Sequence, residues 1–199
     1  RLAPRPEGPL LIVGAGVQGR AHLDAFADVL GVKAVVIASR SEASADALAR
    51  HAQARGLSAE ITSDPDAALT DCPLVVTCTP ASGVTLRALP GPGHFVAAVG
   101  AFTPKMVELA PALCRHVAQT GRIVVDTPQA HHEAGDLLQA GLDVSRFESL
   151  ADVVRIDAAF HSPLHEAGPV LFKSCGWAGW DLAAARCALH TLAGSAKGL

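Results

Sequence analysis

Short apolar segments rich in Val and Ile alternate along this chain with longer segments rich in Ala and Leu. The short segments lie at Leu10–Val13, Ala34–Ala38, Leu74–Cys78, Phe95–Val99, Ile123–Val125 and Val170–Phe172. Runs of this length and composition are typical of buried parallel strands. Two intervening segments, Ala43–Arg55 and Pro104–Gln119, are long enough to form crossover helices. The alternation predicts an α/β fold in which a doubly wound, mostly parallel sheet carries helices on both faces.

Three glycines follow the first predicted strand. The segment from Gly14 to Gly19 reads G-x-G-x-x-G and lies between that strand and a helix-like pattern, which is the context of a dinucleotide-binding Rossmann fold. In this interpretation Gly14 permits a tight turn, Gly16 lets the backbone approach a pyrophosphate, and Gly19 lets the helix pack against the strand. The alternative is a glycine-rich turn that binds no ligand.

The end of the second predicted strand bears on the choice of dinucleotide. An NAD-binding protein usually has Asp or Glu at this place, whereas this chain has Ser39, Arg40 and Ser41. A guanidinium can hold the 2′-phosphate of NADPH through charge-assisted hydrogen bonds, so NADPH is favoured over NADH as the cofactor. The alternative is that Ser39 or Ser41 only caps the next helix, since Ser39 and Glu42 fit a capping box.

Composition narrows the class of protein further. The 199 residues include 16 Lys and Arg and 19 Asp and Glu, scattered along the chain, which gives no electrostatic footprint for nucleic acid. No apolar run is long enough to span a bilayer, so no membrane partner is expected. The five cysteines form no C-x-x-C, which fits a reducing cytoplasm and indicates neither a disulfide framework nor a metal site. Tyr is absent, which excludes the Tyr proton donor of short-chain dehydrogenases from these residues.

Several segments together resemble one known family. They read LLIVGAGVQGRAHL, PLVVTCTPA, VAAVGAFTPKMVEL, IVVDT with HEAGDL, and VLFKSCGWAGWDLAAA. In this order they resemble the dinucleotide domain of the ornithine cyclodeaminase and mu-crystallin family, from about Pro9 to Ala185. By this resemblance the cofactor-binding residues are Gly14, Gly16, Val17, Gln18, Gly19, Ser39, Arg40, Ser41, Thr79, Pro80, Val99, Gly100, Ala101, Ser174 and Cys175.

One position departs from the cyclodeaminase pattern. Where cyclodeaminases have a catalytic aspartate, this chain has Phe102, which cannot exchange protons. The resemblance therefore favours the family branch that reduces Δ1-pyrroline-2-carboxylate to L-proline and Δ1-piperideine-2-carboxylate to L-pipecolate with NADPH. The alternatives are an ornithine cyclodeaminase, which recycles NAD, and a mu-crystallin-like protein that binds NADPH and ligand with little turnover.

The resemblance also implies a division of the chain. Residues 1–8 would end a helix that leads out of an N-terminal substrate and dimerisation domain, which this chain lacks. Residues 9–179 would form the dinucleotide-binding domain, and residues 180–199 a helix that returns toward the absent domain. The family's substrate-binding Arg and Lys would lie in that absent domain, so no catalytic residue is assigned here, and a homodimer would form through it.

Four further features have two interpretations each. His161 and His165 precede Glu166, but Pro163 between them favours a surface loop over a metal site. His131 and His132 are expected at the start of an exposed helix, or as an acid in the site. Lys173 is expected near the cofactor or solvated at a strand end. Cys175 is expected to pack beside the nicotinamide, not to act as a nucleophile.

Overall fold

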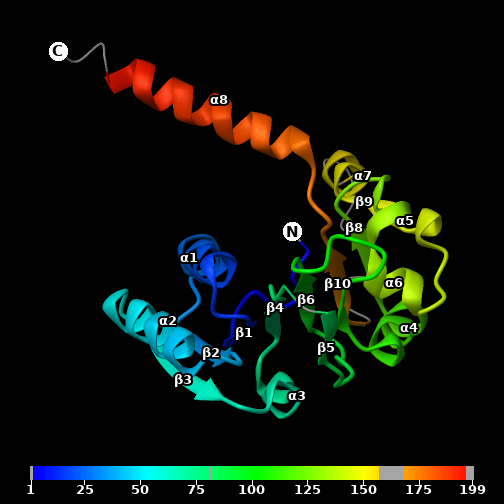
Figure 1. Ribbon diagram of the computed structural model, residues 1–199, viewed down its shortest axis with the longest axis horizontal. Helices are drawn as coiled ribbons and strands as arrows, with labels where there is room; N and C mark the ends of the chain where they lie inside the picture. The colour runs from blue at the N-terminus through cyan, green and yellow to red at the C-terminus, as the bar shows by residue number, and fades with distance from the viewer. Residues whose placement is uncertain (1, 81, 157–167, 196–199) are drawn as a thin grey trace.

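A single parallel sheet of eight strands forms the centre of the protein (Figure 1). The computed structural model describes residues 2–80, 82–156 and 168–195. All pairings in this sheet are parallel, and the strand order is β3-β2-β1-β4-β6-β10-β8-β9. The strands are β1 (Leu10–Val13), β2 (Ala34–Ala38), β3 (Ser58–Thr62), β4 (Leu74–Thr77), β6 (Phe95–Ala98), β8 (Arg122–Val125), β9 (Glu148–Ser149) and β10 (Val170–Lys173).

Helices cover both faces of the sheet, because alternate residues of each strand point to opposite sides. Along β1, Leu10 and Ile12 pack toward Leu23 of α1, whereas Leu11 and Val13 belong to the core that contains Leu113 of α4. The first face carries α1 (Val17–Leu30), α2 (Glu42–Ala54) and α7 (Leu150–Ile156). The second carries α3 (Pro65–Ala68), η1 (Leu69–Asp71), α4 (Pro111–Thr120), α5 (Ala130–Glu133), α6 (Gly135–Gln139) and η2 (Val144–Arg146). The predicted doubly wound α/β fold is confirmed.

The six predicted strands are present, with ends that differ by at most one residue. The predicted helix Ala43–Arg55 corresponds to α2, whose bounds differ by one residue at each end. The predicted helix Pro104–Gln119 is wrong in its first part. Residues 107–109 form β7 (Val107–Leu109), which pairs in parallel with β5 (Ser82–Leu86) in a separate small sheet. The helix begins only at Pro111, which is a favoured residue in a first helical turn because it has no amide to leave unpaired.

The two ends of the chain differ from each other. Residues 2–9 contain no helix, contrary to the expectation for residues 1–8, and Pro4 and Pro6 in this segment lack the amides that a helix would use. At the other end α8 (Ala178–Ser195) extends away from the sheet (Figure 1). Its side chains from Trp180 to Thr191 are exposed. In the described residues, no helix combines the length and the apolar character that crossing a membrane requires.

The strand order reverses between β1 and β4. From β1 the chain adds β2 and β3 on one side, whereas β4 and β6 continue on the other side. In open parallel sheets, ligands bind in the crevice outside the carboxyl ends of the strands at such a point. The loops that follow β1 and β4 therefore border the expected site.

Candidate functional site

The glycine loop has the geometry that its spacing predicts. Gly14 has a φ of 115°, and a Cβ there would lie 2.8 Å from the carbonyl oxygen of Cys78. At Gly19 a Cβ would lie 2.1 Å from the carbonyl oxygen of Gly14, so only glycine allows α1 to approach the loop this closely. Gly16 is the N-cap of α1 and has open space where its Cβ would be. The loop thus presents the positive end of a 14-residue helix to an open surface.

Two pockets lie on either side of this loop. The larger has a volume of about 800 Å³ and the smaller about 700 Å³. Both are lined by Gly16, Cys78, Thr79 and Pro80, so they share one boundary formed by the loops after β1 and β4. Together they form an extended site that crosses the N-terminus of α1.

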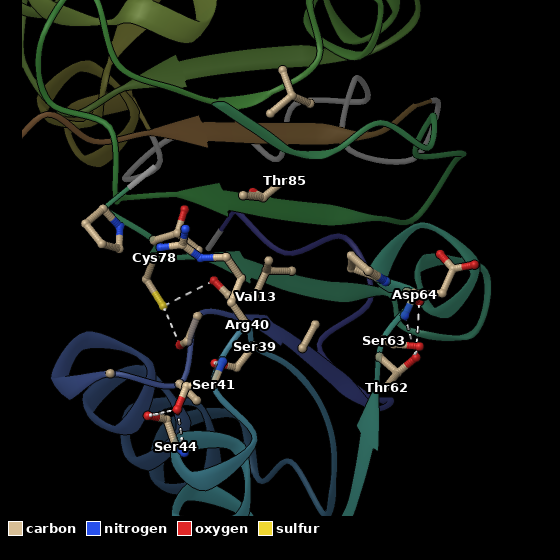
Figure 2. Close-up of a pocket in the computed structure, with 18 of the residues that line it drawn as sticks. Val13, Ser39, Arg40, Ser41, Ser44, Thr62, Ser63, Asp64, Cys78 and Thr85 are labelled. Carbon is tan, nitrogen blue, oxygen red and sulfur yellow. Dashed lines mark hydrogen bonds between the residues drawn. The ribbon is translucent and has the colours of Figure 1, made fainter. Parts of the chain in front are cut away.

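The larger pocket is rich in hydroxyl groups, and its lining includes two exposed arginines, Arg40 and Arg87 (Figure 2). Its wall at the end of β2 consists of Ser39, Arg40, Ser41 and Ser44. Ser41 caps α2, because its Oγ accepts a hydrogen bond of 3.2 Å from the amide of Ser44. The capping box that begins at Ser39 is therefore wrong in register. Ser39 Oγ instead accepts from the amide of Ser41, which holds the turn that carries Arg40.

The opposite wall of the larger pocket contains carboxylates that are already engaged. Asp64 accepts a hydrogen bond of 3.0 Å from the amide of Ala67 and so caps α3. Asp66 accepts from two further backbone amides, those of Arg87 and Ala88. Figure 2 shows Asp64 on the side of the pocket away from Ser39 and Arg40. Arg40 is thus separated from Asp64, whereas the second exposed arginine of the pocket, Arg87, lies next to Asp66 on this wall.

The smaller pocket is mainly apolar. Its lining includes Val17, Gln18, His22, Val99, Gly100, Phe102, Phe172, Ser174, Cys175 and Trp180. Phe102 is 56% exposed although it is aromatic. Burial raises the pKa of the Cys175 thiol to about 12, so Cys175 is a neutral thiol at physiological pH. Among the lining residues that the structure describes there is no carboxylate, lysine or arginine.

Some of the residues singled out in the sequence do not line either pocket. Gly19 and Ala101 are buried, and they act through packing and backbone contacts. Lys173 is fully buried, so the interpretation as a solvated lysine is wrong, and it does not line either pocket. His131 and His132 are exposed on α5, as expected for the surface interpretation. His161, His165 and Glu166 lie outside the described residues.

Three buried carboxylates behind the smaller pocket were missed. Glu108, Asp126 and Asp136 are each at most 4% exposed. Asp126 accepts from the hydroxyl of Ser174 at 3.0 Å and from the amides of Cys175 and Gly176 at 2.7 Å each. It therefore fixes the loop after β10. Its position directly after the buried strand β8 was the available signal in the sequence, because polar groups at the carboxyl ends of parallel strands converge there.

The fold and the site define a protein of the dinucleotide-binding Rossmann class. Residues 2–195 match the model of the ornithine cyclodeaminase/mu-crystallin family, and the chain belongs to this family.

Individual relatives support the same assignment. The chain is 39% identical over 193 residues to Delta(1)-pyrroline-2-carboxylate reductase 2 of Burkholderia ambifaria, covering 96% of this chain and 57% of the relative. It is 36% identical to a Delta(1)-pyrroline-2-carboxylate/Delta(1)-piperideine-2-carboxylate reductase of Azospirillum brasilense, covering 98% and 59%. The chain thus spans little more than half the length of the curated relatives it matches.

A solved structure shares the fold. Thermococcus litoralis Delta(1)-pyrroline-2-carboxylate reductase, in complex with NADH and L-proline, has a TM-score of 0.75 to this chain at 20% identity. The match covers 86% of this chain and 54% of the other.

Proposed function

We propose that this chain is the dinucleotide-binding part of a NADPH-dependent reductase of cyclic imino acids. Its substrates would be Δ1-pyrroline-2-carboxylate, reduced to L-proline, and Δ1-piperideine-2-carboxylate, reduced to L-pipecolate. The reductases of Burkholderia ambifaria and Azospirillum brasilense support this choice among the activities of the family. The observation that carries it is Phe102, which exposes an apolar ring in the smaller pocket where a cyclodeaminase would need a carboxylate.

The site fits a dinucleotide in shape and charge. The open space at Gly16 leaves room for a pyrophosphate against the N-terminus of α1. The hydroxyls of Ser39 and Ser41, with the guanidinium of Arg40, suit the 2′-phosphate of NADPH in the larger pocket. The smaller pocket, with Val99, Gly100, Ser174 and Cys175 in its lining, would take the nicotinamide end.

The chemistry divides between cofactor and protein. When bound, a reduced nicotinamide supplies the hydride for the C=N carbon of the imine. The residues of this chain orient the nicotinamide ring and the imine ring and exclude water from them. Phe102 and Phe172 form the apolar surface that excludes water. His22 is the imidazole in the described lining of the smaller pocket, and we infer that solvent, His22 or another segment of the protein keeps the imine nitrogen protonated.

Two alternatives follow from the same family. An ornithine cyclodeaminase would release ammonia from L-ornithine with NAD, and a mu-crystallin-like protein would bind NADPH with little turnover.

As expected from the family resemblance, we propose a homodimer. The five free cysteines support our proposal of a reducing compartment, the cytoplasm.

The test is an assay of the full-length protein. We expect substrate-dependent oxidation of NADPH with Δ1-pyrroline-2-carboxylate or Δ1-piperideine-2-carboxylate, and no ammonia from L-ornithine. NADPH binding without turnover of either imine would favour the binding protein. Ammonia release with NAD would restore the cyclodeaminase in spite of Phe102.

A further inference from the structure

Glu108 joins two loops that border the smaller pocket. Its Oε1 accepts from the amide of Thr79 at 2.7 Å and from the hydroxyl of Thr79 at 2.9 Å. Its Oε2 accepts from the amides of Gly100 and Ala101 at 2.7 and 3.2 Å. One fully buried carboxylate therefore connects the loop after β4 with the loop after β6.

Glu108 is itself held by a second buried group. Asp136 Oδ1 accepts from the amides of Glu108 and Leu109 at 2.6 and 2.9 Å. On its other side, Asp136 Oδ2 lies 3.0 Å from Lys173 Nζ, and both side chains are fully buried. The ion pair connects α6 with β10, and the two amide hydrogen bonds connect Asp136 with β7, the strand that carries Glu108.

The network ends at Phe102. Lys173 Nζ donates a hydrogen bond of 2.5 Å to the carbonyl oxygen of Ala101, which belongs to the peptide that joins Ala101 to Phe102. The amide of Ala101 is bound to Glu108, so both peptide groups of this residue are fixed by buried charged side chains. Ala101 is fully buried, whereas the next residue is exposed in the smaller pocket.

The space around Glu108 is closely filled. A Cβ at Gly100 would lie 2.5 Å from Glu108 Oε1 and 2.2 Å from the carbonyl oxygen of Thr79. All four donors that face the carboxylate are neutral N–H or O–H groups. Because a glutamine would turn an N–H group toward some of these donors, only the ionised carboxylate can accept from all of them.

We propose that Glu108 is a positioning residue, which holds the loops after β4 and β6 together and so sets the place of Phe102 and of the nicotinamide end of the cofactor. The effect on the cofactor rests on the proposed function, whereas the hold on the loops does not. The amides of Thr79, Gly100 and Ala101 are committed to Glu108 and are not available to bind an anionic ligand. These loops therefore contribute shape, whereas the groups proposed above to bind the pyrophosphate and the 2′-phosphate lie at Gly16 and Arg40.

The first measurement is hydrogen exchange in the protein without added nucleotide. We expect the amides of Thr79, Gly100 and Ala101 to be protected like strand amides, although they lie in loops. In Glu108→Gln their exchange should become at least about tenfold faster, because a hydrogen bond to a charged group is lost. Leu113→Ala, which removes a buried side chain of α4, is the control for general loss of stability.

The second measurement compares two ligands by calorimetric titration. Glu108→Gln should weaken NADPH about tenfold. It should leave 2′,5′-ADP, which fills only the adenosine end, unchanged within about twofold, and Leu113→Ala should weaken neither.

The outcomes are distinguishable. Fast exchange of the amides of Thr79, Gly100 and Ala101 in the parent protein would overturn the proposal, and this measurement does not depend on whether a variant folds. Unchanged exchange of these amides in Glu108→Gln would overturn it as well. Equal weakening of NADPH and 2′,5′-ADP would also overturn it, since Glu108 would then act on the whole fold. If the parent binds neither nucleotide, the proposed function fails, and the exchange data alone decide whether Glu108 holds the loops.

Discussion

Arg40 occupies a position in which one side chain can determine cofactor preference. It is exposed at the end of β2, in a turn that is fixed by the hydrogen bond from the amide of Ser41 to Ser39 Oγ. Because Ser41 also caps α2, a phosphate bound here would meet both a guanidinium and the start of a helix. Capping and phosphate binding are therefore compatible at this site.

Arg40→Ala should weaken the binding of NADPH by about 1.5–3 kcal/mol, the range for hydrogen bonds to charged groups, and should leave NADH nearly unchanged. Calorimetric titration with both cofactors measures the difference. Arg50→Ala removes an exposed arginine of α2, the helix that follows Arg40; Arg50 lies outside both pockets, so this change should alter neither affinity. Equal losses for the two cofactors in Arg40→Ala would contradict a contact with the 2′-phosphate.

Among the individual residues of the site, some could be predicted from the sequence and others could not. The glycine loop follows from local spacing, and the structure gives Gly14 and Gly19 the required geometry. Glu108 and Asp136 could not be predicted in this way, because their burial depends on partners that are distant in sequence. A carboxylate that binds amides 28 or 29 residues away looks like any surface acid in the sequence. Lys173 was misinterpreted for the same reason, since its partner Asp136 was not recognised.

Among the elements, α8 contributes least to the core. Its side chains from Trp180 to Thr191 are exposed, although the helix contains many Ala and Leu residues. Trp180 is 39% exposed and lines the smaller pocket, so the start of the helix borders the site while the rest extends away from it. Burial of apolar surface is the main source of stability, and α8 adds little of it to this chain.

A chain that ends at Trp177 should therefore lose less than about 1 kcal/mol of unfolding free energy. Leu23→Ala, at a fully buried position of α1, should cost about 2–5 kcal/mol and provides the comparison. Urea unfolding monitored by circular dichroism measures both. A loss in the truncated chain as large as that of Leu23→Ala would mean that α8 packs on the domain in solution.

The predictability of the elements follows from their burial. The strands buried on both faces, such as β1 and β4, were found because their apolar runs are continuous. The strand β3 was missed because it lies at the sheet edge and its residues are partly or fully exposed. The short strands β5 and β7 pair with each other outside the main sheet, and their pairing depends on the tertiary fold.

For the whole molecule, buried thiols connect stability with pH. Burial raises the pKa of Cys78 and of Cys114 from 9.0 to about 12, and of Cys72 to about 11. A thiol whose pKa is higher in the folded state than in the unfolded state contributes to stability. This contribution is fully present at pH values below 9.0, the pKa of the unfolded thiol. This contribution is lost as the pH rises from there toward the folded pKa.

The free energy of unfolding should therefore fall between about pH 8 and pH 10, by about 1.4 kcal/mol for a thiol such as Cys114. Tyr is absent, so no phenol adds to this change. At pH 8, Cys114→Ala should be less stable than the parent protein because the substitution leaves a cavity. Between pH 8 and pH 10, however, the free energy of unfolding of the variant should fall by about 1.4 kcal/mol less than that of the parent. Urea unfolding at both pH values measures this, and parallel pH profiles of parent and variant would contradict it.

The place of β10 determines when the sheet can be completed during synthesis. This strand is the last one among residues 2–80, 82–156 and 168–195, yet it lies between β6 and β8 and pairs with both. Until residues 170–173 have left the ribosome, β6 and β8 each have an edge that none of the other described strands covers. Such open edges are where nascent chains add strands from one another and aggregate. The part of the sheet whose loops carry Phe102 and its supporting network therefore cannot be completed before β10 has been synthesised.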